Sequence, residues 1–259
     1  MIEVAIKAAK KAGQIITRAT QHLETIKVSE KARNDLVTNV DRSCEQAIIK
    51  IIRQHYPEHG ILAEESGREK GNDYLWVIDP LDGTVNFIHG LPHFAVSIAI
   101  HYQDKFQHAV VYDPVHKELF TATNGKGARL NDQPISVSKT KQLQGSALCT
   151  GFPFKQLKHL KDYTRMFETF LPYAVGIRRY GAAALDLAYV ACGRLDGFWE
   201  FGIYPWDMGA GVLLIKEAGG VITNFDGQEK YLTQEHIVAG NPEIHQAMLE
   251  IIQNCLKGK

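Results

Sequence analysis

The stretch W-V-I-D-P-L-D-G-T, residues 76–84, decides the fold of this chain, because an acidic turn follows directly on an apolar strand. Its first residues are apolar, which is typical of a buried strand, and Asp79 comes where the chain leaves the sheet. Pro80 fixes its own φ angle, and Asp82-Gly83 then favour a tight turn. Carboxylates at a strand end, beside a turn with free backbone N–H groups, suit a hard cation together with phosphate oxygens.

Two explanations fit this turn. Asp79 and Asp82 lie close together on a bent backbone, so their carboxylates can converge on adjacent metal ions. The Leu81 carbonyl between them is free to join the coordination shell. Aspartate and glycine are also common turn residues that serve only to end a strand. The stretch alone leaves both explanations open.

Three further acidic features favour the metal site. Glu64-Glu65 directly follows another apolar segment, so a second carboxylate leaves a sheet end. Asp41 lies at the start of one predicted helix, and Asp207 lies at the head of another. In isolation each has a plainer explanation, namely a solvated turn, a charge favoured by the helix dipole, and an N-cap. Only their combination with the acidic turn favours a site.

The letters D-x-D-G-T after an apolar strand are also the signature of haloacid-dehalogenase-type phosphatases, which form an aspartyl-phosphate. Counting back from Gly83-Thr84, Asp82 fills the second Asp position, but Pro80 falls where the nucleophile belongs. Asp79 is one residue too early, and proline has no carboxylate to attack phosphorus. A covalent aspartyl mechanism is therefore excluded.

Hydrophobic periodicity divides the chain into alternating helices and short strands. Apolar residues at helical spacing predict helices over residues 2–20, 40–55, 156–170, 182–192 and 206–218. Runs of β-branched or aromatic residues predict strands over residues 61–63, 74–78, 94–101, 109–112, 119–122, 196–201 and 220–225. The predicted hairpin turns are Asn124-Gly125 and Asn131-Asp132, and the predicted helix C-caps are Gly193 and Gly219-Gly220. This pattern predicts an α/β protein in which helices and sheets form layers.

We see no repeat, low-complexity tract or flexible linker in the chain. We expect an N-terminal α+β half, residues 1–145, that carries the metal motif. A C-terminal α/β half, residues 146–259, is expected to contribute Asp207 and the substrate contacts. The two halves are expected to pack as one body, with a soft boundary near residues 140–150.

Composition argues against several classes of protein. The chain has 29 Lys and Arg against 29 Asp and Glu, so its formal net charge is +0, and no global basic field favours nucleic acid or membrane. The four cysteines form no CxxC pair, which favours buried free thiols over a zinc site or a disulfide framework. Charged residues interrupt the N-terminal apolar segment, and no apolar run approaches the roughly 18–20 residues of a membrane span. We therefore expect a cytoplasmic protein.

Five motifs follow one another along the chain: G-I-L-A-E-E-S-G (60–67), W-V-I-D-P-L-D-G-T-V-N-F (76–87), L-P-H-F-A-V-S-I-A (91–99), G-A-A-A-L-D-L-A-Y-V-A-C-G (181–193) and P-W-D-M-G-A-G (205–211). In this order they resemble the inositol monophosphatase family, and specifically its bacterial SuhB-like branch. The resemblance spans about residues 35–241, and the combination of D-P-x-D-G-T with W-D is highly specific. It implies an αβαβα five-layer sugar-phosphatase fold with two sheets between helix layers.

The resemblance also implies Mg²⁺-dependent hydrolysis of a phosphate monoester by metal-activated water, without a covalent intermediate. Glu64, Asp79 and the Leu81 carbonyl would hold the first Mg²⁺ ion. Asp79, Asp82 and Asp207 would hold the second, and Glu64 would support a third, weaker ion. An all-oxygen set of this kind is chemically suited to Mg²⁺.

The catalytic residues implied by the resemblance are Asp41, Thr84 and Glu64, with Thr84 bonding the attacking water and Asp41 orienting the Thr84 hydroxyl. The residues implied to bind substrate are Asp82, Gly83, Thr84, Arg178, Gly181, Ala182, Ala183, Glu200 and Asp207. The lead substrate is myo-inositol 1-phosphate. Glu200 favours a neutral polyol, because a carboxylate accepts hydroxyl hydrogen bonds and repels a second phosphate. Fructose 1,6-bisphosphate and a 3′-phosphonucleotide stay open as alternatives, and the resemblance implies inhibition by lithium.

Two positions depart from the family pattern. Val85 stands where the commonest motif has a second threonine, and we expect little chemical consequence. Many relatives have a lysine upstream of D-L-V-T, but Lys31 is offset from it by one residue. Lys31 is therefore not among the predicted site residues.

SuhB-like relatives also associate with the transcription antitermination machinery. A regulatory protein that binds RNA polymerase or Nus factors is therefore the alternative to an enzyme. Arg178-Arg179 could form a contact patch for such a partner, although a place in the pocket is the plainer explanation. The resemblance also implies a homodimer, which sequence periodicity does not reveal.

Overall fold

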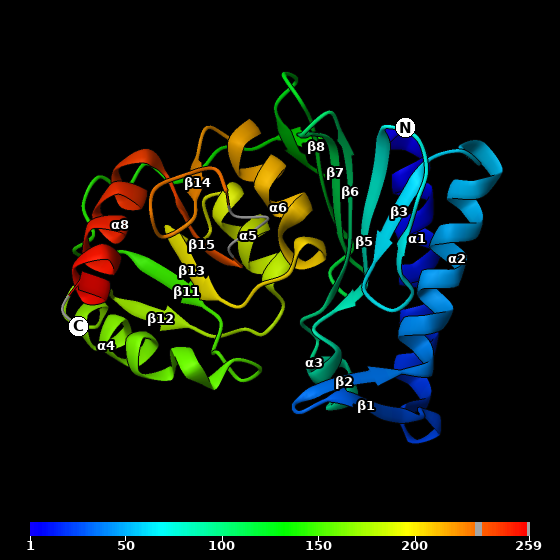
Figure 1. Ribbon diagram of the computed structural model, residues 1–259, viewed down its shortest axis with the longest axis horizontal. Coiled ribbons are helices and arrows are strands. Elements are labelled where there is room, and N and C mark those ends of the chain that lie inside the picture. The colour runs from blue at the N-terminus through cyan, green and yellow to red at the C-terminus, as the bar shows by residue number, and fades with distance from the viewer. Residues whose placement is uncertain (231–234, 258–259) are drawn as a thin grey trace.

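The computed structural model describes residues 1–230 and 235–257, and its helices and sheets alternate in five layers (Figure 1). One outer layer holds α1 (Ile2–Ala19) and α2 (Asn39–His55), and the other holds α4 (Leu160–Phe170) and α8 (Pro242–Lys257). The middle layer, between the two sheets, holds α5 (Ala183–Ala191) and α6 (Pro205–Glu217). The predicted αβαβα architecture is confirmed.

The larger sheet has eight strands in the order β10-β9-β8-β7-β6-β5-β3-β4. They are β3 (Gly60–Ala63), β4 (Gly67–Glu69), β5 (Tyr74–Asp82), β6 (Ala95–Tyr102), β7 (Lys105–Asp113), β8 (Glu118–Thr123), β9 (Ala128–Leu130) and β10 (Gln133–Pro134). Strand β5 pairs in parallel with β3 and antiparallel with β6, and its pairing with β6 becomes irregular between Asp79 and Asp82. Pro80 lies in this irregularity and has no N–H to donate, so the ladder breaks and the acidic turn leaves the sheet.

The smaller sheet has five strands in the order β12-β11-β13-β15-β14. They are β11 (Ala147–Thr150), β12 (Gly176–Arg178), β13 (Gly197–Phe201), β14 (Val221–Thr223) and β15 (His236–Gly240). Strand β11 pairs in parallel with both β12 and β13. The carboxyl ends of these strands therefore lie at the same edge of the sheet and carry Thr150, Arg178 and Glu200 there.

A separate hairpin of β1 (Val28–Ala32) and β2 (Asp35–Thr38) lies beside the short helix α3 (Thr84–Ile88) in Figure 1. Helix α3 begins directly after the acidic turn. Two 3-10 segments, Thr20–Thr25 and Leu157–His159, follow α1 and precede α4. The hairpin and α3 thus stand at the end of the larger sheet where β5 leaves it.

Helices α1 and α2 cover the outer face of the larger sheet because each carries an apolar stripe. Ile16, Ile48 and Ile52 are fully buried there, and each contributes roughly 2 kcal/mol relative to exposure. Thr38 caps α2: its Oγ1 accepts the Val40 N–H at 3.0 Å, and the Asp41 carboxylate accepts the Thr38 N–H at 2.9 Å. This cap fixes the first turn of α2 at the carboxyl end of the larger sheet.

The middle layer joins the two sheets into one core. Apolar side chains from both sheets pack on α5 and α6, among them Ala99 of β6 and Phe198 of β13. The two helices approach each other closely at Gly211, where a Cβ would lie 2.5 Å from Leu187 Cδ1 and 2.6 Å from Leu187 Cβ. Only glycine permits this spacing.

Each predicted helix and strand is present, with ends shifted by a few residues. The two predicted turns join β8 to β9 and β9 to β10. Gly193 and Gly219 follow α5 and α6 with φ angles of 74° and 83°, as expected of left-handed C-caps. Helix α8 is absent from the predicted elements, although Ile244, Met248 and Ile252 repeat there at helical spacing and are buried.

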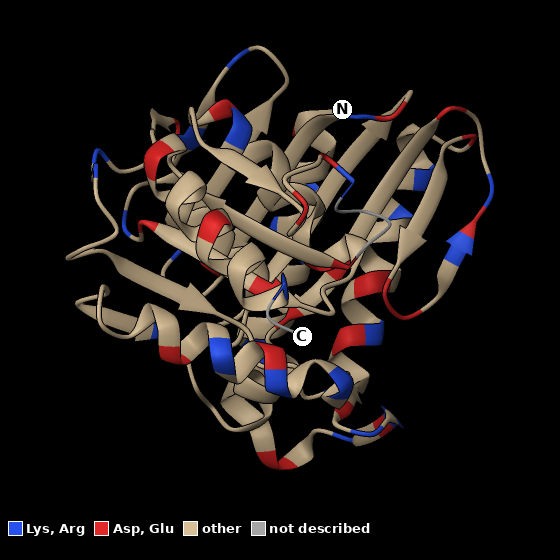
Figure 2. Ribbon diagram, turned by 60° about the vertical axis from the view of Figure 1, so that its left-hand side comes forward, with Lys and Arg blue, Asp and Glu red and all other residues tan. Residues whose placement is uncertain are grey.

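Residues of both charge signs are interspersed along the helices (Figure 2). This agrees with the formal net charge of +0. The four cysteines are free thiols, as predicted. In residues 1–230 and 235–257, no helix combines the length and the apolar character needed to cross a membrane.

Candidate active site

A cavity of about 660 Å³ opens where the carboxyl ends of β3 and β5 face the carboxyl ends of β11, β12 and β13. The predicted site residues that line it are Glu64, Asp79, Leu81, Asp82, Gly83, Thr84, Gly181, Ala182, Ala183, Glu200 and Asp207. They come from widely separated segments of the chain. The fold therefore brings nearly all of the predicted metal and substrate residues to one place.

The end of β5 presents two carboxylates to this cavity. Asp79 is only 1% exposed. Asp82 Oδ2 accepts the Ala184 N–H at 2.7 Å, which ties the larger sheet to the start of α5. Gly83 follows with a φ angle of 92°, and a Cβ there would lie 2.9 Å from the His93 carbonyl oxygen, so the turn requires glycine.

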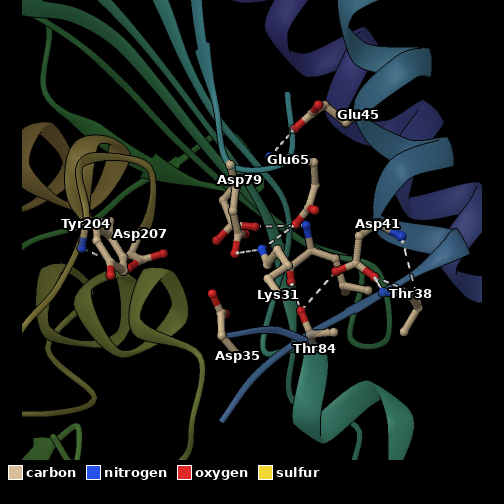
Figure 3. Close-up of polar contacts among 12 residues, drawn as sticks. Lys31, Asp35, Thr38, Asp41, Glu45, Glu65, Asp79, Thr84, Tyr204 and Asp207 are labelled. Atoms are coloured by element: carbon tan, nitrogen blue, oxygen red, sulfur yellow. Dashed lines mark hydrogen bonds and ion pairs between the residues drawn. The ribbon is translucent and has the colours of Figure 1, made fainter. Parts of the chain in front are cut away.

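Asp207 reaches the cavity from the first turn of α6. Pro205 opens this helix, where a missing N–H costs nothing because that group has no partner within the helix. The Asp207 Oδ2 accepts the Tyr204 N–H at 3.0 Å (Figure 3). The helix cap therefore fixes the Asp207 carboxylate at the cavity wall, opposite the end of β5.

Burial and mutual repulsion raise the pKa values of these carboxylates. Burial, and then the charges of Glu64, Asp82 and Asp207, raise the pKa of Asp79 well above its ordinary value. Burial and the charge of Asp207 raise the pKa of Asp82 in the same way. Burial is also the main cause that raises the pKa of Asp207 to about 7 and that of Glu200 to about 8. A cation in the cavity would relieve this repulsion.

The donor atoms fit Mg²⁺. Each predicted ligand offers oxygen, and the described lining residues include neither histidine nor cysteine. Within the described ranges, no three acidic, histidine or cysteine side chains already surround one point as a complete metal cage. Mg²⁺ usually keeps several waters and shares its shell with substrate phosphate, so an open protein shell suits it.

Thr84 connects this turn to α2. Its Oγ1 lies 2.9 Å from Asp41 Oδ1 and 3.1 Å from the Leu81 carbonyl oxygen (Figure 3). Asp41 is 1% exposed, and its Oδ2 accepts hydrogen bonds from the N–H and the hydroxyl of Thr38. Burial raises the pKa of Asp41, and the bonds from Thr38 and Thr84 oppose that rise. The Thr84 hydrogen is directed at these acceptors, so its lone pairs are left to accept a hydrogen bond from water.

Lys31, which the prediction leaves out of the site, contacts two acidic side chains in the turn after β3. Its Nζ lies 2.8 Å from Glu64 Oε1 and 2.8 Å from Glu65 Oε1 (Figure 3). Burial acts to lower the pKa of Lys31, but the two glutamates raise it above its ordinary value. A β-bulge between Glu30 and Ala32 explains the offset in sequence, because it inserts one extra residue at Lys31.

Arg178 is predicted to bind substrate, but the arginine among the described lining residues is its neighbour, Arg179. The Arg178 guanidinium folds back over Gly176, where a Cβ would collide with its Nη1. Side chains alternate along a strand, so the residue after Arg178 points the other way. The Arg179 guanidinium lies 5.6 Å and 5.3 Å from the ring centroids of Phe152 and Phe154, which hold it by cation–π contacts.

Other residues at the cavity have no clear signal in the sequence. Gly151 lies against Glu200, and a Cβ on it would collide with Glu200 Cδ, so the carboxylate fills space that only glycine leaves. The Lys155 ammonium lies 2.6 Å from Asp35 Oδ1 and joins hairpin β1–β2 to the smaller sheet's side of the cavity. These partners are far apart in sequence, and only the folded chain pairs them.

A sequence profile described as the inositol monophosphatase family matches residues 1–257. The chain belongs to the inositol monophosphatase family. It is similar to "Nus factor SuhB" of Pseudomonas aeruginosa, with 52% identity over 259 residues that cover 98% of this chain and 96% of the relative. This similarity places the chain in the SuhB branch.

Solved structures of family members agree with this assignment. The extragenic suppressor protein SuhB of Bartonella henselae matches with a TM-score of 0.95 and 40% identity, covering 100% of this chain and 99% of that one. The IMPase of Thermotoga maritima matches with a TM-score of 0.90 and 33% identity, covering 99% and 98%. The family, the branch and the fold implied by the sequence motifs are therefore confirmed.

Proposed function

We propose that the cavity binds Mg²⁺ and hydrolyses the phosphate monoester of a small polyol or sugar. The observation that carries this proposal is that Glu64, Asp79, Asp82 and Asp207 line one cavity with Thr84, although they come from separate elements. Membership of the inositol monophosphatase family supports it. Two to three ions, as the family implies, would be held by these carboxylates and one backbone carbonyl.

The chain's own groups act on water and substrate. Asp41 holds the Thr84 hydroxyl so that its oxygen accepts a hydrogen bond from the attacking water, which orients that water towards phosphorus. The four carboxylates alone would repel a phosphate dianion, so substrate binding depends on a counter-charge between them. Mg²⁺, when bound, supplies that charge and the Lewis acidity that makes water a stronger acid and stabilises the leaving alcohol's oxygen. Arg179 adds a fixed positive charge to the cavity wall.

The lead substrate we propose is myo-inositol 1-phosphate. Glu200 lies in the cavity wall, where it can form hydrogen bonds with polyol hydroxyls. Its pKa is raised to about 8, but bound Mg²⁺ would favour the ionised form, and the carboxylate would then repel a second phosphate. Fructose 1,6-bisphosphate and a 3′-phosphonucleotide are the alternatives. Phosphate release from each of the three compounds, measured with Mg²⁺ and with added lithium, ranks them and tests the expected lithium inhibition.

The matched pair Asp82→Asn and Asp104→Asn tests the enzyme. In the first variant the amide oxygen can still accept the Ala184 N–H, so we expect the fold to persist while the lost charge lowers phosphate release by at least about 100-fold. Asp104 is exposed in the β6–β7 turn, and we expect its variant to keep full activity. Near-normal turnover by Asp82→Asn would refute the metal assignment.

We also propose a second role, in transcription antitermination. The relative from Pseudomonas aeruginosa is named a Nus factor, and this name favours the regulatory role more directly than the cavity favours any one substrate. The partners would be RNA polymerase or other Nus factors, which suits a cytoplasmic protein. Affinity purification with wild-type and Asp82→Asn protein separates the roles, because we expect both to retain these partners. Failure of both to retain them would count against this role.

A homodimer is proposed as well. Among the residues that the structure describes, most of the large exposed apolar side chains fall between residues 152 and 180, including Leu171 at 51% and Val175 at 75%. Large contiguous patches of exposed apolar side chains mark protein–protein interaction sites. Analytical ultracentrifugation of wild type and Val175→Asp measures the association, and we expect the variant to be more monomeric.

A further inference from the structure

Helix α2 carries two buried carboxylates one turn apart, Asp41 and Glu45, which are 1% and 4% exposed. Residues four apart lie on the same face of a helix, so both carboxylates face the carboxyl end of the larger sheet. Asp41 is accounted for by its bonds to Thr38 and Thr84. Burying a second carboxylate so close to the first is costly unless it accepts hydrogen bonds or pairs with a cation.

Glu45 binds the backbone of the turn that follows β3. Its Oε2 accepts the Glu65 N–H at 2.8 Å (Figure 3). The preceding N–H, that of Glu64, donates to the Ile78 carbonyl of β5 at 3.1 Å. The N–H of Glu64 is therefore bound by β5, and the next N–H, that of Glu65, is bound by α2. The backbone of Glu64 is thus fixed at both of its peptide groups.

The turn spans residues 64–66, between β3, which ends at Ala63, and β4, which begins at Gly67 and pairs with it. On the cavity side the turn is bound by Lys31, which contacts both glutamate side chains from the exposed hairpin strand β1. That contact binds only the two glutamate side chains, whereas the N–H groups of Glu64 and Glu65 are bound by the Ile78 carbonyl and by Glu45. The bond from Glu45 restrains the backbone itself, and with it the direction in which Glu64 enters the cavity.

We propose that Glu45 is a positioning residue: it holds the turn after β3 so that the Glu64 carboxylate is presented to Mg²⁺. This rests on the proposed function, in which Glu64 is a metal ligand. Partners that orient a metal ligand commonly change metal affinity by about 10–100-fold when they are removed. Through Asp41 and Glu45, one helix face would then position both the Thr84 hydroxyl and a metal ligand.

The test compares Glu45→Gln, Glu45→Leu and the exposed control Gln46→Leu on the same helix. Mg²⁺ affinity is read from the Mg²⁺ concentration that gives half of the maximal rise in melting temperature, which requires no turnover. We call this concentration the Mg²⁺ midpoint. Glutamine keeps an oxygen that can accept the Glu65 N–H, so we expect the midpoint of Glu45→Gln to stay within about threefold of wild type. Leucine cannot accept the bond, so we expect the midpoint of Glu45→Leu to rise about 10–100-fold. Saturating Mg²⁺ should restore much of the turnover of Glu45→Leu. The melting temperature of each variant without metal separates lost fold stability from lost Mg²⁺ affinity, because Mg²⁺ stabilises any folded variant that binds it. Should Glu45→Leu lack a cooperative transition, Glu45→Met replaces it, because methionine has a similar length and is flexible.

The outcomes are distinct. An unchanged Mg²⁺ midpoint in Glu45→Leu would overturn the inference. An equal rise of the midpoint in Glu45→Gln and Glu45→Leu would overturn it too, because the charge of Glu45 and not its accepted hydrogen bond would then determine Mg²⁺ affinity. Wild type that shows neither Mg²⁺ stabilisation nor phosphate release would instead refute the proposed function. Active wild type with a shifted midpoint only in the apolar variant supports both.

Discussion

At the scale of single residues, Thr84 shows how position determines chemical use. A threonine hydroxyl both donates and accepts, but here its hydrogen faces Asp41 and the Leu81 carbonyl oxygen. Its oxygen is therefore presented to the cavity as an acceptor. The same hydroxyl on a solvent-facing turn would rotate freely and orient nothing.

Replacing Thr84 by serine and by valine tests this arrangement. Serine keeps the hydroxyl and should retain activity within about tenfold. Valine keeps the shape but leaves the buried Asp41 oxygen without its donor, and we expect kcat to fall by about 10²–10⁴-fold. Steady-state kinetics with saturating Mg²⁺ measures both. Equal activity of the two variants would show that the hydroxyl is not used.

The neighbouring arginines give a second test at this scale. Arg179 lines the cavity and Arg178 does not belong to the described lining, so the two alanine variants should differ. We expect Arg179→Ala to raise KM for the phosphorylated substrate by about 10-fold or more, since a charge-assisted contact is lost. Arg178→Ala should leave KM unchanged. A raised KM for Arg178→Ala with an unchanged KM for Arg179→Ala would instead support the sequence-based prediction that Arg178 binds substrate.

At the scale of elements, α5 and α6 form the layer on which both sheets pack. Their contact depends on Gly211, and alanine there would place a Cβ 2.5 Å from Leu187 Cδ1. Alanine normally favours a helix over glycine by about 1 kcal/mol. Overpacking opposes that gain at this position.

We therefore expect Gly211→Ala to lower the free energy of unfolding by about 1–3 kcal/mol despite its better helix propensity. Chemical denaturation followed by circular dichroism measures this. The double variant Gly211→Ala with Leu187→Ala removes the obstructing side chain, and it should lose less than the sum of the two single changes. Additive losses would indicate that the close contact is not the cause.

How far the sequence predicts an element depends on whether its signal is local. Strand β5 and its acidic turn are contiguous, so the acidic motif could be found without the fold. Hairpin strand β1 is exposed along its length and has no apolar alternation, so no periodic signal marks it. Three other residues meet their partners only in the folded chain. A bulge places Lys31, the end of β12 places Arg179, and one face of α2 places Glu45.

At the scale of the whole molecule, we expect the cavity to link the stability of the fold to pH and to bound metal. In the folded chain burial and neighbouring charges raise the pKa of Asp207 to about 7 and that of Glu200 to about 8, above their unfolded values. Groups with a raised folded pKa contribute stability below the unfolded pKa and lose it as pH rises through the folded pKa. Without metal, stability from these groups should therefore decline between about pH 4 and pH 8.

This predicts that chelator-treated protein melts at a lower temperature at about pH 8.5 than at about pH 6. Mg²⁺ should raise the melting temperature more at the higher pH. There the cavity carboxylates are already ionised, so Mg²⁺ neutralises their charge without first displacing protons from them. Glu200→Gln should flatten the pH dependence of the metal-free protein. Equal stabilisation by Mg²⁺ at both pH values would contradict the link.

The bond from the Ala184 N–H to Asp82 has one more consequence. It joins the larger sheet to α5 across the cavity. Neither half of the chain holds the whole cavity lining, since Asp82 belongs to β5 of the larger sheet and Glu200 and Asp207 belong to β13 and α6. If the chain were cut between Pro134 and Ala147, where no strand runs, each fragment would carry an unfinished cavity. If the proposed phosphatase activity holds, phosphate release from the mixed fragments would then measure how well they reassemble.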